Sequence, residues 1–192
     1  ERVSVGPGGV EGNTESAGPA ISADGRWVVF HSLASNLVTG DTNGAADIFV
    51  RDVVAGTTER VSIDGAGAQG DGASEYPAIS ADGRYVAFHS EAPNLVAGDT
   101  NGAWDVFVHD RTTGSTTRVS VDSAGNQQSL GYFPSISADG RYVAFESGDD
   151  TIVTPDVGWW EVFVRDRTAG TTTKVSVDSL DNQGAGHSEF PS

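Results

Sequence analysis

The sequence predicts an all-β protein with three complete four-stranded antiparallel sheets, the blades of a β-propeller, and partial strands at both ends. Three observations lead to this fold class. Two short motifs recur along the 192 residues with nearly one period. Each period contains four short runs rich in Val, Ile, Phe, Tyr and Thr, the residue types that favour strands. Two of these runs are almost continuously apolar, which indicates strands that are covered on both faces.

The repeats are internal to the chain and are marked by two independent motifs. The motif Arg/Lys-Val-Ser-Val/Ile begins at positions 2, 60, 118 and 174. The motif Ile-Ser-Ala-Asp-Gly-Arg begins at positions 21, 79 and 136. Both give a period of 56 to 58 residues, so each period is one structural unit that stacks on its neighbours. A β-solenoid is the rival interpretation, but its coils are usually shorter and lack hairpins.

The second period illustrates the strands expected in each unit. They are 76–80, 84–90, 104–110 and 116–122. Gly83 lies in the Ala-Asp-Gly turn between the first two strands, where it can adopt positive φ at no steric cost. A longer loop, Glu91 to Ala103, joins the second and third strands. The blades are expected at about 19–63, 77–121 and 134–177, with 1–18 and 178–192 forming a partial blade and connecting loops.

The repeated motif resembles a known family. Pro-x-Ile-Ser-Ala-Asp-Gly-Arg-aromatic-Val-x-Phe, then an apolar run ending in Asp, then Thr-x-Arg-Val-Ser, resembles the TolB-type (WD-like) β-propeller repeat over essentially the whole chain. The family usually carries Pro before the Asp-Gly turn, where this chain has Ala23, Ala81 and Ala138. The resemblance implies a propeller fold. It leaves the function open, because such propellers serve as periplasmic interaction modules, enzyme-appended domains and secreted proteins.

Both ends of the chain fall within a blade in this interpretation. Arg2 to Val5 is expected to be a fourth strand, and Phe190 to Ser192 the beginning of a first strand. Propellers close with about four to eight blades, and three cannot close a ring. We therefore expect either a fragment of a longer propeller or a chain that assembles with other copies of itself.

The charge of the chain excludes some partners. Its 27 acidic and 11 basic residues give a formal net charge of -16. Nucleic acids and anionic membrane surfaces need a positively charged partner, so neither is expected to bind. No apolar run approaches the roughly 20 residues that span a bilayer, so membrane insertion is not expected. There is no cysteine, and therefore neither a disulfide nor thiol chemistry.

Two acidic loops with the pattern Asp-Thr-Asn-Gly-Ala-x-Asp are candidate calcium sites. Their oxygen-bearing side chains are Asp41, Asn43 and Asp47 in the first copy, and Asp99, Asn101 and Asp105 in the second. Oxygen ligands at positions 1, 3 and 7 with an intervening Gly resemble part of a calcium loop. Asn36 and Asn94, upstream in each copy, are candidates for a further ligand. The third copy, 155–161, has lost two ligands. The alternative is that Asp and Asn only shape the turn through their own side chains.

Tryptophans are the candidate ligand-binding groups. Trp104 and Trp160 occupy the repeat position of Ala46, and Trp159 lies beside the latter. Indole rings at blade edges stack on sugars, but they pack equally well against a neighbouring blade. His31 and His89 are equivalent positions and are expected to be structural, hydrogen-bonded histidines.

No constellation of catalytic residues is evident, and repetition argues against the single asymmetric site that an enzyme needs. The sequence therefore predicts a non-catalytic, secreted or periplasmic propeller module for binding or assembly, stabilised by calcium in the first two acidic loops. Its partners would be further blades, other copies of itself, a protein or a glycan. Two alternatives stay open: a carbohydrate-binding, lectin-like propeller, and a propeller domain appended to a hydrolase.

Overall fold

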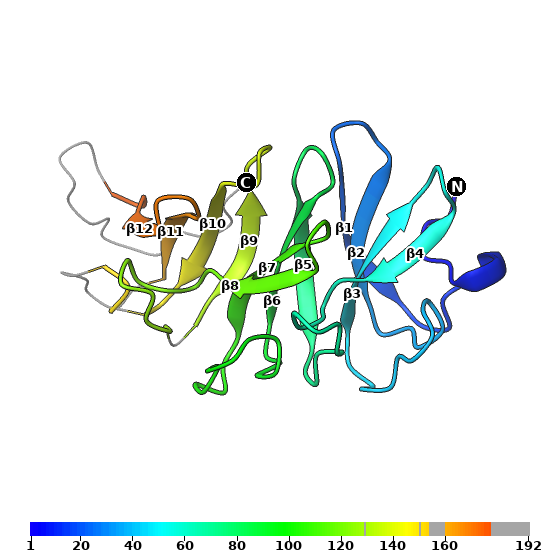
Figure 1. Cartoon of the computed structure of the whole chain (residues 1–192), viewed down its shortest axis with the longest axis horizontal. Coiled ribbons are helices and arrows are strands. Elements are labelled where there is room, and N and C mark those ends of the chain that lie inside the picture. Colours follow the sequence, from blue (N-terminus) through cyan, green and yellow to red (C-terminus); the bar gives the residue numbers. More distant parts are fainter. Residues whose placement is uncertain (129, 150, 154–159, 178–192) are drawn as a thin grey trace.

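Three four-stranded antiparallel sheets make up the computed structural model of this chain, which describes residues 1–192 except 129, 150, 154–159 and 178–192. Figure 1 shows the sheets side by side in chain order, from blue and cyan through green to yellow and orange. In every sheet the strands neighbour one another in the order in which they follow along the chain. The predicted fold class is therefore confirmed as an open, partial β-propeller. Among the described residues, no helix is long and apolar enough to cross a membrane.

The three blades have closely similar strand bounds. The first contains β1 (Ser16–Ile21), β2 (Trp27–Ser32), β3 (Asp47–Asp52) and β4 (Thr57–Arg60). The second contains β5 (Ser74–Ile79), β6 (Tyr85–Ser90), β7 (Asp105–Asp110) and β8 (Ser115–Arg118). The third contains β9 (Tyr132–Ile136), β10 (Tyr142–Ser147), β11 (Glu161–Asp166) and β12 (Thr171–Lys174). A short 3-10 helix, η1 (Pro7–Gly9), precedes the first blade.

The expectation that Arg2 to Val5 forms a fourth strand is wrong. Val5 makes only an isolated bridge to Glu11. The equivalent segments show the reason, because β4, β8 and β12 each end at the Arg or Lys that begins this motif. The next residue of the motif adds one more backbone hydrogen bond, from the Val61 N–H to the Ile48 carbonyl at 2.9 Å, and its side chain packs between blades at 1% exposure, but the regular strand has ended. The expected first strand at 190–192 lies outside the described residues.

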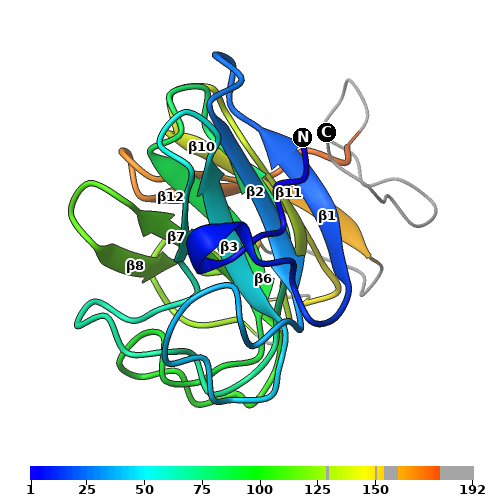
Figure 2. The same cartoon turned by 90° about the vertical axis from the view of Figure 1, so that its right-hand side faces the viewer.

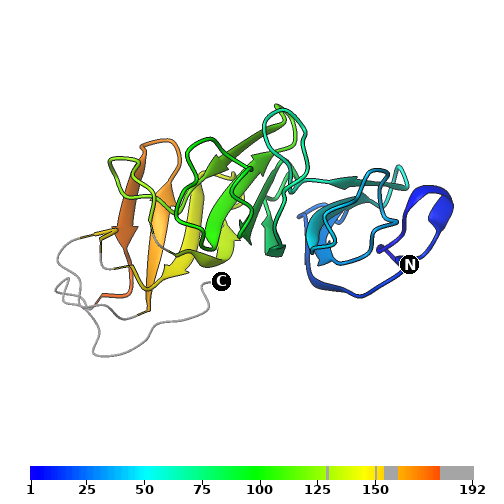
Figure 3. The same cartoon turned by 90° about the horizontal axis from the view of Figure 1, so that it is seen from below.

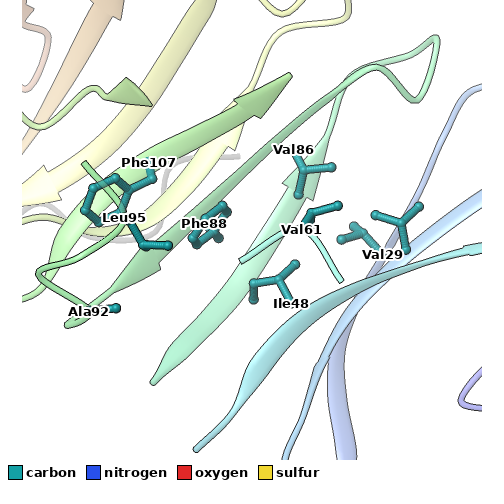
Figure 4. Close-up of a cluster of buried hydrophobic side chains, with 9 residues drawn as sticks. Val29, Ile48, Val61, Val86, Phe88, Ala92, Leu95 and Phe107 are labelled. Carbon is teal, nitrogen blue, oxygen red and sulfur yellow. The ribbon is translucent and has the colours of Figure 1, made fainter. Parts of the chain in front are cut away.

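Each central strand sends alternate side chains to its two neighbouring blades. In β7, Phe107 packs in the core shared with the first blade, whereas Val106 and Val108 pack in the core shared with the third. All six residues of β3 and of β7 are buried. Covering on both faces, predicted from the continuous apolar runs, is thus confirmed for these strands. Figure 4 shows the first inter-blade core, where Val29 and Ile48 of the first blade face Val86 and Phe88 of the second.

A second contact between blades repeats at the turns at the upper edge in Figure 1. The Asp-Gly turn of one blade covers the aromatic residue that begins the second strand of the preceding blade. Trp27 lies against Gly83, and the guanidinium of Arg111 stacks 3.8 Å from the centre of its ring. Arg111 also donates to the Gly83 carbonyl at 2.5 Å. The next pair of blades makes the same contact with Tyr85, Gly140 and Arg167.

Backbone hydrogen bonds join these turns in a row. The Ala23 N–H donates to the Ala81 carbonyl, and the Ala81 N–H donates to the Ala138 carbonyl, both at 3.0 Å. The view from below in Figure 3 shows the sheets following one another in the same order, and Figure 2 looks along the row with the first blade in front. Each blade is therefore fixed to the next by an apolar core and by a turn-to-ring contact.

A glycine comparison tests the turn-to-ring contact. Gly25 and Gly83 both have φ +73°, but a Cβ on Gly83 would lie 2.1 Å from the Trp27 ring, whereas a Cβ on Gly25 meets nothing within 4 Å. We expect Gly25→Ala to lower the free energy of unfolding by about 1–2 kcal/mol through backbone strain alone. Gly83→Ala should lose a further amount of about 1–3 kcal/mol through overpacking. Urea unfolding measures both variants, and equal losses would argue against the contact.

An Arg–Asp pair holds the second strand to the third in every blade and gives a prediction on pH. Arg84 donates to both oxygens of Asp110, at 2.9 and 2.7 Å, and holds the pKa of that carboxyl well below its usual range. Because folding lowers this pKa, the ion pair contributes its full stabilisation above the ordinary Asp pKa of about 4. The stabilisation is lost as the pH falls from there through the lowered pKa. Asp110→Asn should therefore lose less stability than the wild type between neutral pH and acid. Asp71→Asn, at an exposed loop position, should follow the wild-type profile.

Candidate functional site

The acidic loop of the first blade closes around a buried carboxylate. Asp47 begins β3 with 0% exposure and accepts hydrogen bonds from Ser62 Oγ at 2.5 Å and Gln69 Nε2 at 2.8 Å. Its Oδ2 lies 3.3 Å from Arg60 Nη1. Asp41 accepts from the same Gln69 Nε2 at 3.0 Å and lies 3.6 Å from Arg60 Nη1. One guanidinium and one amide thus serve both carboxylates.

The amide of Asn43 is oriented by the same network. Its Nδ2 donates to the Gly70 carbonyl at 2.9 Å and approaches Asp47 Oδ2 at 3.4 Å. Its Oδ1 accepts from the Ala45 N–H at 3.0 Å, which closes a turn within the loop. The oxygen expected to bind calcium therefore already holds a backbone N–H of its own loop.

The second blade repeats this arrangement residue by residue. Asp105 accepts from Ser120 Oγ at 2.5 Å and from Gln127 Nε2 at 3.2 Å. Asp99 accepts from the same Gln127 at 2.7 Å, and Arg118 lies 3.3 Å from Asp99 and 3.5 Å from Asp105. Asn101 makes the same three contacts as its counterpart in the first blade, to Asp105, to the Gln128 carbonyl and from the Ala103 N–H.

Burial governs the electrostatics of both clusters. Removal from water raises the pKa of Asp47 and of Asp105, while the serine hydroxyl and the arginine act in the opposite direction. Arg60 and Arg118 are themselves only 11% exposed at the side chain. Each cluster is therefore a nearly dry set of two carboxylates and one guanidinium.

Calcium stays a prediction. The fold brings the three predicted residues of each loop together, but their oxygens face arginine, glutamine and serine donors. Among the residues that the structure describes, no three His, Cys, Asp or Glu side chains gather so that they could hold a metal ion. Asn36 and Asn94 bind backbone of the preceding connecting loop, donating to the carbonyls of Glu11 and Gln69 at 2.8 Å. These contacts favour the interpretation that the loops are shaped by their own hydrogen bonds.

The third blade departs from this pattern. Glu161 stands in the place of Asp105, is fully buried and accepts from Ser176 Oγ. Lys174 stands in the place of the arginine. Most of the third acidic loop, 154–159, and with it Trp159, lies outside the described residues.

A row of aromatic and imidazole rings crosses the blades near the ends of their second strands. Trp104 packs edge-on to His89 with ring centres 4.9 Å apart, and Tyr132 lies between Trp104 and Trp160 at 6.2 and 5.5 Å. Tyr76 continues the row toward the first blade. Both tryptophans are half-buried, and neighbouring rings cover part of the surface of each. Binding of a ligand by Trp104 and Trp160 stays a prediction.

The two equivalent histidines connect adjacent blades. His31 Nδ1 accepts from the backbone N–H of Tyr76 at 3.3 Å, and His89 Nδ1 accepts from that of Phe133 at 3.1 Å. An accepting Nδ1 places the ring proton on Nε2 of a neutral imidazole. Burial lowers the pKa of His89 to about 3, so it stays neutral at physiological pH. The expected structural role of these histidines is confirmed.

The residues that bind the histidines carry an unusual backbone. Tyr76 and Phe133 are the non-glycine residues with positive φ among those described, at +49° and +47°. Gly18 occupies the same position in the first blade with φ +59°. Aromatic residues rarely adopt this conformation, and strain of this kind persists where surrounding contacts enforce it. Here the bulge that generates it places each ring in the row.

Comparison with known proteins establishes the fold only. No family model and no curated protein matches the sequence. Among solved structures, the chain is similar to a TolB-like protein from Agrobacterium tumefaciens, with 21% identity and a TM-score of 0.57 over 84% of this chain and 49% of that one. It is also similar to the β-propeller domain of the Trilobed protease from Pyrococcus furiosus, with 14% identity and a TM-score of 0.51 over 83% of this chain and 41% of that one.

The chain thus spans about half the length, or less, of these two structures. Identities of this size show a common fold, and they do not establish a common activity. The TolB-type β-propeller predicted from the repeats is confirmed at the level of the fold.

Removing the guanidinium tests the acidic cluster. Arg118→Gln leaves two carboxylates without their cation, one of them fully buried, so the free energy of unfolding should fall by about 3–5 kcal/mol. Arg2→Gln removes the same charge from an exposed pair with Glu11 and should cost about 0–1 kcal/mol. Urea denaturation compares the two variants. Equal effects would show that Arg118 does not stabilise the cluster.

Calcium and EDTA test the metal prediction on the wild type. One guanidinium already offsets one of the two negative charges in each cluster and pairs with both carboxylates. If the loops are only turns shaped by their own hydrogen bonds, the melting temperature in excess calcium should equal that in EDTA. A calcium-dependent rise in melting temperature that disappears in Asp99→Asn would instead establish the metal site.

Proposed function

We propose that this chain is a non-catalytic β-propeller module, secreted or periplasmic like other propellers with this type of repeat, which acts by binding and assembly. Its end blades would associate with further blades of the same kind, from the same chain or from other copies. The observation that supports this most strongly concerns the contact between neighbouring blades. The two junctions between the three blades make this contact in full, and each end blade exposes residues that would form one half of it.

The outer face of the third blade offers one half of that contact. Its β11 residues Val162 and Val164 are partly exposed, whereas the equivalent Val106 and Val108 of β7 have 0% exposure. Val175 is 48% exposed, although its counterparts in the first two blades are almost fully buried. The apolar residues of this face lack the cover that the next blade gives elsewhere.

The turn region of the third blade is open in the same way. Tyr142 is 40% exposed, and among the described residues only Arg141 of its own blade stacks on it, whereas both Arg84 and Arg167 stack on Tyr85. The Ala138 N–H continues the row of turns but donates to no backbone carbonyl among the described residues.

The first blade offers the complementary half. A Cβ on Gly25 would meet nothing within 4 Å, so this turn is free to cover an aromatic ring as Gly83 does. Ile21 is 60% exposed, whereas Ile79 packs partly against the inter-blade core. Val53 replaces the arginine that stacks on the ring in the other blades, so this end would bind a neighbour more weakly.

The absence of catalysis is supported by the way in which buried ionisable groups are used. The carboxylates, arginines and histidines described above occur as equivalent pairs in two blades, with the same partners in each. Groups repeated in this manner stabilise the fold of each blade, whereas an active site needs one asymmetric constellation of residues.

The assembly proposal predicts concentration-dependent association. The wild-type chain should sediment above its 19.9 kDa mass as its concentration rises, because the open faces are complementary. Tyr142→Asp places a charge in one face and should return the chain to the monomer. Ala66→Asp adds the same charge at an exposed residue of the loop between β4 and β5, away from both end faces, and should associate like the wild type. A wild type that stays monomeric at every concentration would contradict the proposal.

A further inference from the structure

A hollow of about 160 Å³ lies beside His31 in the first blade, away from the end faces. It is lined by Glu15, Ala17, His31, Ser32, Leu33, Ala46 and Glu75. Ala17 lies in β1 and His31 and Ser32 lie at the end of β2, while Glu15, Leu33 and Ala46 adjoin strands of the same blade. Glu75 comes from β5 of the next blade. The hollow therefore spans the junction between the first and second blades.

The second blade shows what kind of group fits this place. There the repeat position of Ala46 carries Trp104, whose indole packs edge-on to His89 at 4.9 Å. Tyr132 of the third blade occupies the repeat position that Glu75 occupies in the second blade. The Tyr132 ring adjoins both His89 and Trp104. In the first blade the indole is missing and the space beside the imidazole is open. A flat group from outside the chain can take the position that Trp104 takes in the second blade.

The substitutions in the first blade also change the charge of the site. Glu15 and Glu75 replace Ala73 and Tyr132, so that two carboxylates flank the imidazole where the second blade has an alanine and a ring. Both act electrostatically on His31, and neither forms an ion pair with another described residue. A flat ligand for this hollow should therefore be a cation.

The rest of the molecule identifies the flat cation that such surroundings accept. Guanidinium groups stack on aromatic rings at both inter-blade turns, and Arg111 lies 3.8 Å from the centre of the Trp27 ring while pairing with Glu59 at 2.6 Å. Stacking and bidentate pairing with carboxylates are properties of arginine, since an ammonium group lacks the planar fork.

We propose that this hollow binds an arginine side chain of a partner peptide, with its guanidinium packed against His31 in the position that Trp104 takes beside His89, and paired with Glu75 and Glu15. The aliphatic stem would lie against Ala17 and Ala46. A metal ion fits less well, because His31 Nδ1 already accepts the Tyr76 N–H and only two carboxylates remain. A neutral sugar would leave the partly buried carboxylate of Glu75 without a counter-charge.

Acetyl-arginine methylamide is the probe, because it presents the side chain in a peptide without terminal charges. Titrated into the isotope-labelled chain, it should shift the amide resonances of Ala46 and Glu75 in a saturable way. Acetyl-citrulline methylamide has nearly the same shape without the charge and should bind about tenfold more weakly, a difference of about 1.4 kcal/mol. A wild type that shows no saturable shift, or that binds citrulline equally well, would overturn the proposal.

Substitutions separate the hollow from the general negative charge of the chain. Ala46→Trp should fill the hollow and abolish binding without loss of stability, because the second blade accommodates Trp104 at this position. Glu75→Gln should weaken binding about tenfold. Asp71→Asn makes the same change of charge at an exposed loop position and should bind like the wild type. If Ala46→Trp fails to fold, Glu75→Gln against Asp71→Asn decides alone, and equal affinities in that pair would overturn the proposal.

Discussion

The contact between neighbouring blades is the interaction on which the rest of this structure depends. Strands such as β3 and β7 are apolar on both faces, and a single four-stranded sheet covers neither face. Each core therefore draws residues from two blades, as Val29 and Phe88 do in the first. The turn-to-ring contact then fixes the spacing of the blades, because Gly83 approaches Trp27 so closely that no side chain fits between them. Stability in such an array is a property of adjacent pairs.

The acidic clusters serve the same contact from the opposite edge of the blades. Gln69, which binds both Asp41 and Asp47, lies in the segment that connects the first blade to the second. Its backbone carbonyl accepts from Asn94 of the second blade at 2.8 Å. The cluster thus joins a long loop, the end of the fourth strand and the path to the next blade. The charged groups of the cluster fix the path of the chain between blades. The cation that pairs with the two carboxylates is an arginine of the same chain.

Much of this architecture follows from the sequence, because repetition and apolar pattern report directly on blades that are covered on both faces. The Arg-Val-Ser motif shows where such reasoning fails. Its β-branched residues indicate a strand, but the regular strand β4 ends at Arg60 and the Val61 side chain packs between the blades. The convergence of Asp41, Asn43 and Asp47 was predictable from their spacing. Their partners Arg60 and Gln69 were not, since only the fold brings them to the loop, although both recur one period later as Arg118 and Gln127.

Native-state hydrogen exchange of the three equivalent central strands tests most directly whether cover by a neighbour determines the stability of a blade. The account predicts that amides of β3 and β7 exchange only through global unfolding, whereas those of β11 open at a lower free energy because its outer face is only partly covered. Phe163, at the centre of β11, is the most informative position, with Phe49 and Phe107 as its counterparts. Equal protection at all three would show that each blade is stable by itself and would contradict the account.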